Sequence, residues 1–226
     1  MVIDLRFITI HPAFIQAYLG FGVYKSSKVK GLAEFSVVDL RDYSVDKRGS
    51  VDGTPYGGGD GMVMRPEPLA RSIQAMKDNP VVIMPSPSGG PFSQSSVDEL
   101  STLGRPLVLV CGRFAGVDQR FVDKYVDYEF SVGDFVISGG ELPALMIGDA
   151  LLRQLPGALG NGLSASHDSY GAGCDGILEH AQYTKPAVFE NEGVPPVLLS
   201  GDHKAISRWK KSSGLERTQR LRPDLL

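Results

Sequence analysis

Hydrophobic residues in the first two thirds of the chain form short continuous runs, separated by segments with helical periodicity. The runs VVIMP and PLVLVCG are typical of central strands buried on both faces. Strands are expected at Val2–Ile10, Glu34–Asp39, Val81–Met84, Pro106–Val110 and Phe135–Ser138. Helices are expected at Pro12–Leu19, Pro66–Lys77, Ser93–Leu100, Val117–Tyr125 and Glu141–Leu152. This alternation predicts an α/β domain whose mostly parallel sheet is covered by helices.

The pattern changes after Leu155. The segment PGALGNGLSASHDSYGAGCDG is rich in small residues and has little apolar periodicity. It predicts a flexible linker over residues 159–176, between a domain spanning 1–158 and a small, mainly helical domain spanning 177–226. Two helices are expected in the small domain, around 203–211 and 213–220.

Glycine and proline interrupt the chain near the ends of three apolar runs. The breaks are Pro85–Gly90, Cys111–Arg113 and the pair Gly139-Gly140, which precedes the expected helix at Glu141. Glycine has no Cβ, so a backbone can pass close to a ligand there, and the helix N-terminus adds unpaired N–H donors. Ligands of parallel sheets lie at the carboxyl ends of the strands. The three loops therefore predict one ligand site.

A fourth glycine-rich segment, Tyr56–Met62, has four glycines in five consecutive positions. Two interpretations are open: a surface hairpin connection, or a segment where another chain or a ligand approaches the backbone. Neither GxGxxG after a first strand nor GxxxxGK[ST] occurs in the chain. Their absence counts against a dinucleotide-binding Rossmann enzyme and a P-loop enzyme.

Composition narrows the class of protein. Of the 226 residues, 42% are hydrophobic, which is enough for a core, and no apolar run approaches the roughly 18 residues of a membrane span. The N-terminus carries Asp4 within its apolar run, so no signal peptide is expected. Cys111 and Cys174 lie in unrelated contexts, which favours a reduced, cytoplasmic protein. No CxxC, HxH or HExxH pattern occurs, so no residue is assigned as a metal ligand.

The charge is distributed unevenly along the chain. Residues 201–226 hold seven Lys and Arg against three Asp and Glu, a charge of +4, while the remaining residues carry −7 of the total of −3. A basic tail on an acidic body indicates a polyanionic partner. A solvated helix face would explain the same charges. Trp209 stands among Arg208, Lys210 and Lys211, where it could stack on a base or anchor the small domain.

Seven motifs occur in a fixed order: PYGGGDGMVM, SPSG, CGRFAGVDQR, SVGDFVISGGELPALMIGDALLRQLPG, HDSY, QYTKP and VPPVLLSGDHKAISRW. Together they resemble the bacterial tRNA (guanine-N1)-methyltransferase family TrmD, from the N-terminal strand to the final RPDLL. The resemblance implies a SPOUT-class domain with a deep trefoil knot and an obligate homodimer. It also implies transfer of a methyl group from S-adenosylmethionine to N1 of guanine 37 in tRNA.

The resemblance also implies site residues. S-adenosylmethionine would be bound by three loops, whose residues are Pro85, Ser86, Pro87, Gly112, Val132, Gly133, Phe135, Ile137, Gly139 and Gly140. Asp168, in HDSY, would be the general base that removes the N1 proton, and Arg153 would stabilise charge on guanine O6. Without the resemblance, an aspartate in a Gly/Ser-rich stretch is more typical of a turn, and an arginine at a helix C-terminus commonly complements the dipole.

Some positions depart from the family pattern. Ala115 replaces a glutamate that is associated with the site and with Mg²⁺, and Phe135 replaces the usual tyrosine. We therefore expect an active enzyme whose dependence on Mg²⁺ is altered. Arg113 is a further candidate, for an RNA phosphate or the cofactor carboxylate. Two alternatives stay open: a SPOUT methyltransferase acting on another RNA nucleotide, and a non-catalytic tRNA-binding relative.

Overall fold

The computed structural model describes residues 2–160 and 167–226. The chain divides into two compact units, residues 1–160 and 161–226, and each is described by itself. Residues 161–166 of the expected linker lie outside the described residues. Of its remaining parts, 159–160 belong to the first unit and 167–176 to the second. Among the described residues, no helix combines the length and the apolar character that a membrane span requires.

A five-stranded parallel sheet forms the centre of the first unit. Its strands are β1 (Ile3–Thr9), β2 (Ala33–Asp39), β5 (Val81–Pro91), β6 (Leu107–Val110) and β7 (Tyr128–Ser131). Their order is β2-β1-β6-β5-β7, and every neighbouring pair is parallel. The expected parallel α/β architecture is confirmed.

The expected strand at Phe135–Ser138 is wrong, because the fifth strand is β7, Tyr128–Ser131. Phe135, Val136 and Ile137 are exposed rather than buried in the sheet, and the backbone at Gly133 has a φ of +149°. Residues Phe135–Ser138 therefore form a loop rather than a strand. The true strand was missed because only Phe130 of its four residues is buried.

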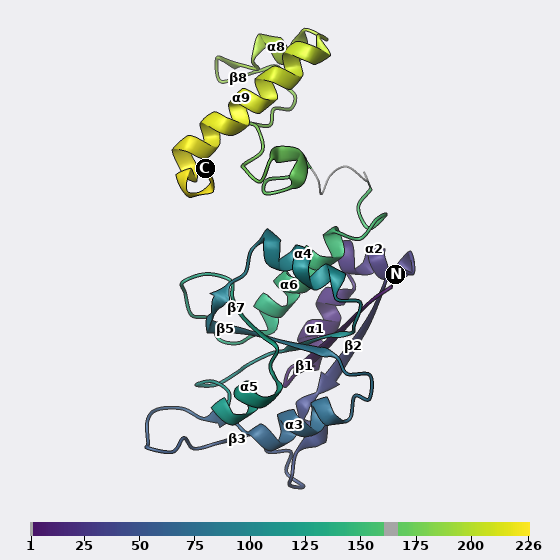
Figure 1. Ribbon diagram of the computed structural model, residues 1–226, viewed down its shortest axis with the longest axis vertical. Helices are drawn as coiled ribbons and strands as arrows, with labels where there is room; N and C mark the ends of the chain where they lie inside the picture. The colour runs from purple at the N-terminus through teal and green to yellow at the C-terminus, as the bar shows by residue number, and fades with distance from the viewer. Residues whose placement is uncertain (1, 161–166) are drawn as a thin grey trace. The chain divides into compact units, whose positions relative to one another are not determined.

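Helices cover both faces of the sheet (Figure 1). On one face α1 (Pro12–Leu19), α2 (Gly22–Val29), α4 (Gln94–Thr102) and α6 (Glu141–Arg153) pack on a core that includes Leu5 and Phe7 of β1. On the other face α3 (Pro66–Gln74), α5 (Gln119–Tyr125) and the short 3₁₀ helix η1 (Leu40–Tyr43) pack on Ile8 and Val108. Alternate residues of each strand thus pack into the two cores on opposite faces of the sheet.

The sequence did not predict α2, whose apolar pattern is weak. Its contribution to the core is Tyr24, which is fully buried and donates a hydrogen bond from Oη to the carbonyl oxygen of Leu145 at 2.8 Å. Burial raises the pKa of Tyr24. A Cβ at position 148 would lie 2.1 Å from this hydroxyl oxygen, so Gly148 of α6 makes room for the Tyr24 hydroxyl.

The glycine-rich segment connects a short antiparallel hairpin of β3 (Asp52–Gly53) and β4 (Val63–Met64). The hairpin interpretation is therefore correct. Its base is joined to the loop after β6: the N–H of Met64 donates to the carbonyl of Gly116, and the N–H of Ala115 donates to the carbonyl of Met62, both at 2.8 Å.

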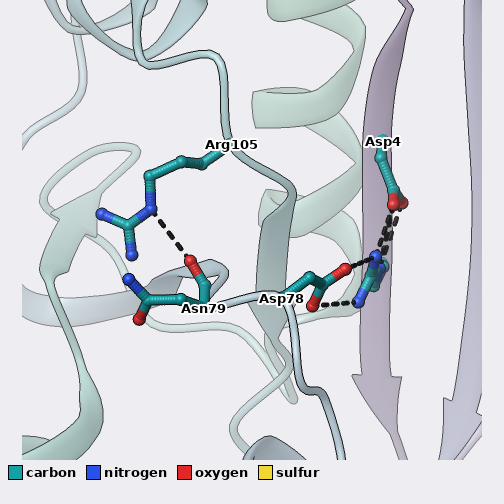
Figure 2. A network of polar contacts seen from close by, with 5 residues as sticks. Asp4, Asp78, Asn79 and Arg105 are labelled. Atoms are coloured by element: carbon teal, nitrogen blue, oxygen red, sulfur yellow. Dashed lines mark hydrogen bonds and ion pairs between the residues drawn. The ribbon is translucent and has the colours of Figure 1, made fainter.

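Polar contacts secure the amino ends of the strands (Figure 2). Arg6 of β1 pairs with Asp4 and with Asp78, which lies just before β5. Arg105, just before β6, donates from Nε to the carbonyl of Asn79 at 2.9 Å. The hydrogen bonds from Arg6 hold the pKa of Asp78 below its usual value. These contacts lie at the end of the sheet away from the glycine and proline loops.

The second unit is built on one long helix, α9 (His203–Leu221). Around it lie η2 (Ala172–Cys174), β8 (Val188–Phe189), β9 (Glu192–Gly193), α8 (Pro196–Leu199) and η3 (Pro223–Leu225). The expectation of two helices over 203–220 is wrong, because α9 continues through Gly214. A Cβ there would lie 2.8 Å from the carbonyl oxygen of Leu178, so the glycine allows close packing instead of ending the helix.

Candidate active site

A cavity of about 190 Å³ opens at the carboxyl edge of the sheet, between the loops that follow β6 and β7 and a bulge in β5. All ten residues that the resemblance assigns to cofactor binding line it. The sequence did not single out Phe114, Val136, Ser138 or Pro143, which also line the cavity. Their only sequence signal is their position within or beside the three loops.

The first loop is a bulge within β5 rather than the end of a strand. Pro85 and Gly90 both pair with Phe130 of β7, so the four residues between them loop out toward the cavity. A Cβ at Gly89 would lie 2.5 Å from the main chain of Glu129. Glycine at this position therefore allows β5 to return to β7 after presenting Ser86 and Pro87 to the cavity.

The pair Gly139-Gly140 has a different role from the one that the sequence suggested. The N–H of Gly140 donates to the carbonyl of Gly112 at 2.8 Å, and a Cβ on Gly140 would lie 2.8 Å from the nitrogen of Gly112 and 3.0 Å from Cα of Cys111. The absent side chains thus let two loops of the protein pass against each other. Gly140 therefore permits a close approach between main chains, whereas a Cβ on Gly139 would meet the side chains of Arg113 and Glu141.

Arg113 and Glu141 form an ion pair beside the cavity. Glu141 is buried, and its carboxylate accepts from the Thr9 hydroxyl at 2.8 Å and from Nε of Arg113 at 3.1–3.2 Å. Arg113 also donates from Nη1 to the carbonyl of Ser138 at 2.7 Å. Arg113 therefore fixes the third loop and the start of α6. The sequence suggested that Arg113 contacts an RNA phosphate or the cofactor carboxylate, and it did not predict the ion pair with Glu141.

Arg153 lies in the last turn of α6, as expected. The helix begins beside the cavity at Glu141 and Pro143, so Arg153 stands about 18 Å farther along the helix axis. It does not line the cavity. One turn before it, burial raises the pKa of Asp149, and the charge of Arg153 opposes that rise.

Asp168 lies in the second unit, in a groove formed by the segment around η2 and by α9. His167, His180, Lys210 and Lys211 line the same groove. The proposed base is thus placed among histidine and lysine side chains of its own unit. This neighbourhood was not evident from the spacing of these residues in the sequence.

Trp209 of α9 packs within the second unit. Its ring centroid is 6.1 Å from that of His180, edge-on, and 6.2 Å from that of Tyr183. Burial lowers the pKa of His180, and the nearby charge of Lys210 acts in the same direction. Of the two roles open for Trp209, these contacts favour the anchor of the domain.

Comparison with known proteins gives the family. A family model described as tRNA (Guanine-1)-methyltransferase TrmD matches residues 3–226. The chain belongs to this family. The chain is 46% identical to a tRNA (guanine-N(1)-)-methyltransferase of Geobacter sulfurreducens over 222 residues, which cover 97% of the chain and 89% of the relative. It is 43% identical over 226 residues to one from Dictyoglomus turgidum, covering 100% and 90% of the two chains.

A third relative with the same name, from Alcanivorax borkumensis, is 44% identical over 223 residues, covering 97% of the chain and 83% of the relative. The match to the TrmD family includes both units described above. The resemblance read from the seven motifs is therefore confirmed.

Proposed function

We propose that the protein transfers the methyl group of S-adenosylmethionine to N1 of guanine 37 in tRNA. The observation that carries the proposal is the cavity at the carboxyl edge of the sheet, lined by all ten expected cofactor residues in a chain of the TrmD family. Bound there, S-adenosylmethionine would supply an electrophilic methyl group on sulfur.

The residues present fit such a ligand. Val132, Ile137 and Pro143 offer apolar surface for an adenine ring, and the glycine loops offer main-chain donors and acceptors. The N–H of Gly140 is used internally, since it bonds to Gly112. Recognition of the adenine edge therefore falls to other main-chain groups of the three loops.

Methyl transfer to guanine N1 requires loss of the N1 proton, which is present at neutral pH. Asp168 accepts this proton in our proposal, an effect worth roughly 10²- to 10⁴-fold in rate. Arg153 stabilises the negative charge that then develops on guanine O6. The target base must leave its stack to expose N1, and the anticodon loop allows this at modest cost.

We further propose that the three loops form the trefoil knot of the SPOUT class. The chain between β7 and α6 lies against the loop after β6, with the Gly140–Gly112 hydrogen bond joining the two. The tight main-chain contact at Gly140 agrees with one segment threading past another. Knots are otherwise very rare in proteins, so periodicity alone could not predict one.

A homodimer with a shared site is also part of the proposal. Arg153 lies about 18 Å along α6 from the cavity end, beyond the reach of its side chain. Leu142 and Met146 are exposed on the same helix, and Val136 is exposed on the third loop. A second copy covering this apolar surface would bury it and bring its own side chains to the cavity.

Light scattering tests the dimer. The wild-type chain is expected to be a dimer at micromolar concentration, and Met146→Lys is expected to weaken association because it places a charge on the apolar surface. Val188→Lys is the matched control, since Val188 is exposed on β8 of the second unit. A monomeric wild-type chain would contradict the proposal.

The residues around the cavity bear on whether methyl transfer depends on Mg²⁺. Residues 2–160 and 167–226 contain no cluster of three or more His, Cys, Asp or Glu that could hold a metal ion. Ala115, beside the cavity, offers no ligand oxygen from its side chain. We propose that methyl transfer depends less on Mg²⁺ than in a glutamate-bearing relative. Turnover measured across Mg²⁺ concentrations, for both enzymes, tests this, and identical dependences would reject it.

The second unit, with its basic α9, binds the tRNA in this account, and the enzyme works in the cytoplasm with its substrate. Incorporation of labelled methyl into a tRNA bearing G37, against the same tRNA bearing A37, tests the function. We expect label only with G37, recovered as 1-methylguanosine at position 37. Label at another nucleotide would favour a different RNA target, and donor binding without turnover would favour a non-catalytic relative.

A further inference from the structure

The segment that carries Asp168 is folded onto the C-terminal part of the chain, within the second unit. The N–H of Gly171 donates to the carbonyl of Asp168 at 3.0 Å, which makes a turn at the aspartate. The N–H of Tyr170 donates to the carbonyl of Ile177 at 2.9 Å, and the hydroxyl of Ser169 accepts from the N–H of Glu179 at 3.1 Å. The turn is thus held by main-chain hydrogen bonds and by the Ser169 hydroxyl against residues 177–179.

Arg222 holds this turn from the other end of the unit. Its Nη1 donates to the Tyr170 hydroxyl at 3.1 Å, and its guanidinium carbon lies 5.8 Å from the centre of the Tyr170 ring. Asp224 orients the guanidinium: its carboxylate accepts from Nε at 2.9 and 3.2 Å and from Nη2 at 2.7 Å. Arg222 in turn is fixed by α9, because its N–H donates to the carbonyl of Thr218 at 2.8 Å.

The backbone at Tyr170 requires such support. Its φ is +69°, a left-handed conformation that costs free energy for a residue with a large side chain. The surrounding contacts must therefore specify it. Arg222 and Asp224 are both exposed, and exposed ion pairs contribute little to stability. Their arrangement is better explained by the geometry they impose on Tyr170 than by stabilisation of the fold.

We propose that Arg222 is a positioning residue for methyl transfer, which acts through Tyr170 to set the orientation of the turn that carries Asp168. The inference rests on the proposed function, in which Asp168 removes the proton from guanine N1. A base displaced by about 1 Å can lose a large part of its effect, so a contact two residues away is sufficient to control the rate. Arg222 itself touches no reacting atom.

The alternative role for Arg222 is a phosphate contact, as one cation of the basic tail. Arg222→Met and Arg220→Met separate the two roles, because both remove one positive charge and Arg220 is an exposed residue of the last turn of α9. With saturating tRNA and S-adenosylmethionine, we expect Arg222→Met to slow the single-turnover rate about 10-fold and to change the KM for tRNA less than about 3-fold. Arg220→Met removes a cation of the helix proposed to bind tRNA, so it should raise the KM for tRNA and leave the single-turnover rate at saturating tRNA within about 2-fold.

Tyr170→Phe removes only the hydroxyl that accepts from Arg222, so it keeps the ring and tests the contact with little risk to folding. It should slow the rate in the same sense as Arg222→Met, by a smaller factor. S-adenosylmethionine affinity, a property of the first unit, should be unchanged in all three variants. An unchanged rate in both Tyr170→Phe and Arg222→Met would overturn the inference.

The decisive comparison uses Asp168→Asn. If Arg222 acts through Asp168, the double variant Asp168→Asn/Arg222→Met will react no more slowly than Asp168→Asn alone. A further loss of about 10-fold in the double variant, or a raised KM for tRNA with an unchanged rate in Arg222→Met, would overturn the positioning role and leave the proposed function standing. A wild-type chain that transfers no methyl to G37, or Asp168→Asn with the wild-type rate, would overturn both.

Discussion

The two units of this methyltransferase build their candidate sites from different materials. In the first unit the cavity is shaped by main chain: a bulge in β5, a glycine contact between two loops, and one buried ion pair. In the second unit the groove around Asp168 is lined by side chains of the segment 167–182 and of α9, charged ones such as Lys210 and Lys211 beside apolar ones such as Ile177 and Ile206. The first site thus depends on tight packing, and the second on side-chain orientation.

This difference predicts that variants of the two units lose different properties. Variants of the first unit should lose stability and donor binding together, because the loops proposed to bind the donor also make the main-chain contact at Gly140 and the ion pair with buried Glu141. Variants of the second unit should lose tRNA affinity or reaction rate, and their affinity for S-adenosylmethionine should be unchanged.

Arg113→Met should have the largest effect on stability. It leaves the buried carboxylate of Glu141 without its cation, and removing one partner of a buried pair costs about 3–5 kcal/mol. Arg105→Met is the control, since the described hydrogen bonds of Arg105 go to the neutral carbonyls of Asn79 and Pro80 rather than to a buried carboxylate, and their loss should cost about 1 kcal/mol. Urea unfolding of both variants measures the difference, and equal costs would reject the structural role of Arg113.

Gly140→Ala should cost about 1–3 kcal/mol and abolish donor binding, because its Cβ would meet main-chain atoms of Cys111 and Gly112 that cannot move aside. Gly90→Ala is the matched control in the β5 bulge, where a Cβ would meet no atom within 4 Å. Calorimetric titration with S-adenosylmethionine reports the loss. Normal S-adenosylmethionine binding by Gly140→Ala would show that the loops at Gly112 and Gly140 can move apart without loss of the site. It would contradict the dependence of the first site on tight packing.

Acidification should affect the two units in different pH ranges. The pKa of His180 is lowered by burial, so below about pH 6.5 the unfolded chain binds more protons and the second unit loses stability as the pH falls. The pKa of Asp78 is lowered by Arg6, so its contribution to the first unit is present above about pH 4 and is lost as the pH falls further.

Trp209 is the only tryptophan and lies in the second unit, so its fluorescence during denaturant unfolding reports that unit alone. Far-ultraviolet circular dichroism reports mainly the first. His180→Phe keeps a ring against Trp209 and should flatten the dependence of the second unit between about pH 5 and 7. A wild-type fluorescence midpoint that is constant over this range would contradict the assignment.

The sequence predicted the sheet and the loops of the first unit well, because buried parallel strands leave continuous apolar runs. The strand predicted at Phe135–Ser138 is wrong, because the apolar residues there line the cavity and are exposed instead of packing in the core. It also could not show that Gly140 packs on Gly112, since a missing side chain looks the same whether a ligand or a backbone fills the space.

In the second unit, sequence reasoning placed Asp168 through family resemblance but gave no account of what holds it. The contact between Tyr170 and Arg222 joins positions 52 residues apart and has no local signal. The sequence likewise suggested two helices, around 203–211 and 213–220, whereas one helix runs through this region and Gly214 packs against Leu178. Long-range polar contacts are the part of a site that patterns along a chain do not reveal.

We infer that the first unit holds the methyl donor and that Asp168 of the second unit removes the proton from guanine N1. Donor affinity and single-turnover methyl transfer to G37 tRNA, measured side by side for wild type and Asp168→Asn, test it most directly. The account predicts a rate at least about 10²-fold lower with S-adenosylmethionine affinity within about 2-fold of wild type. An unchanged rate, or donor affinity that falls in parallel with the rate, would contradict it.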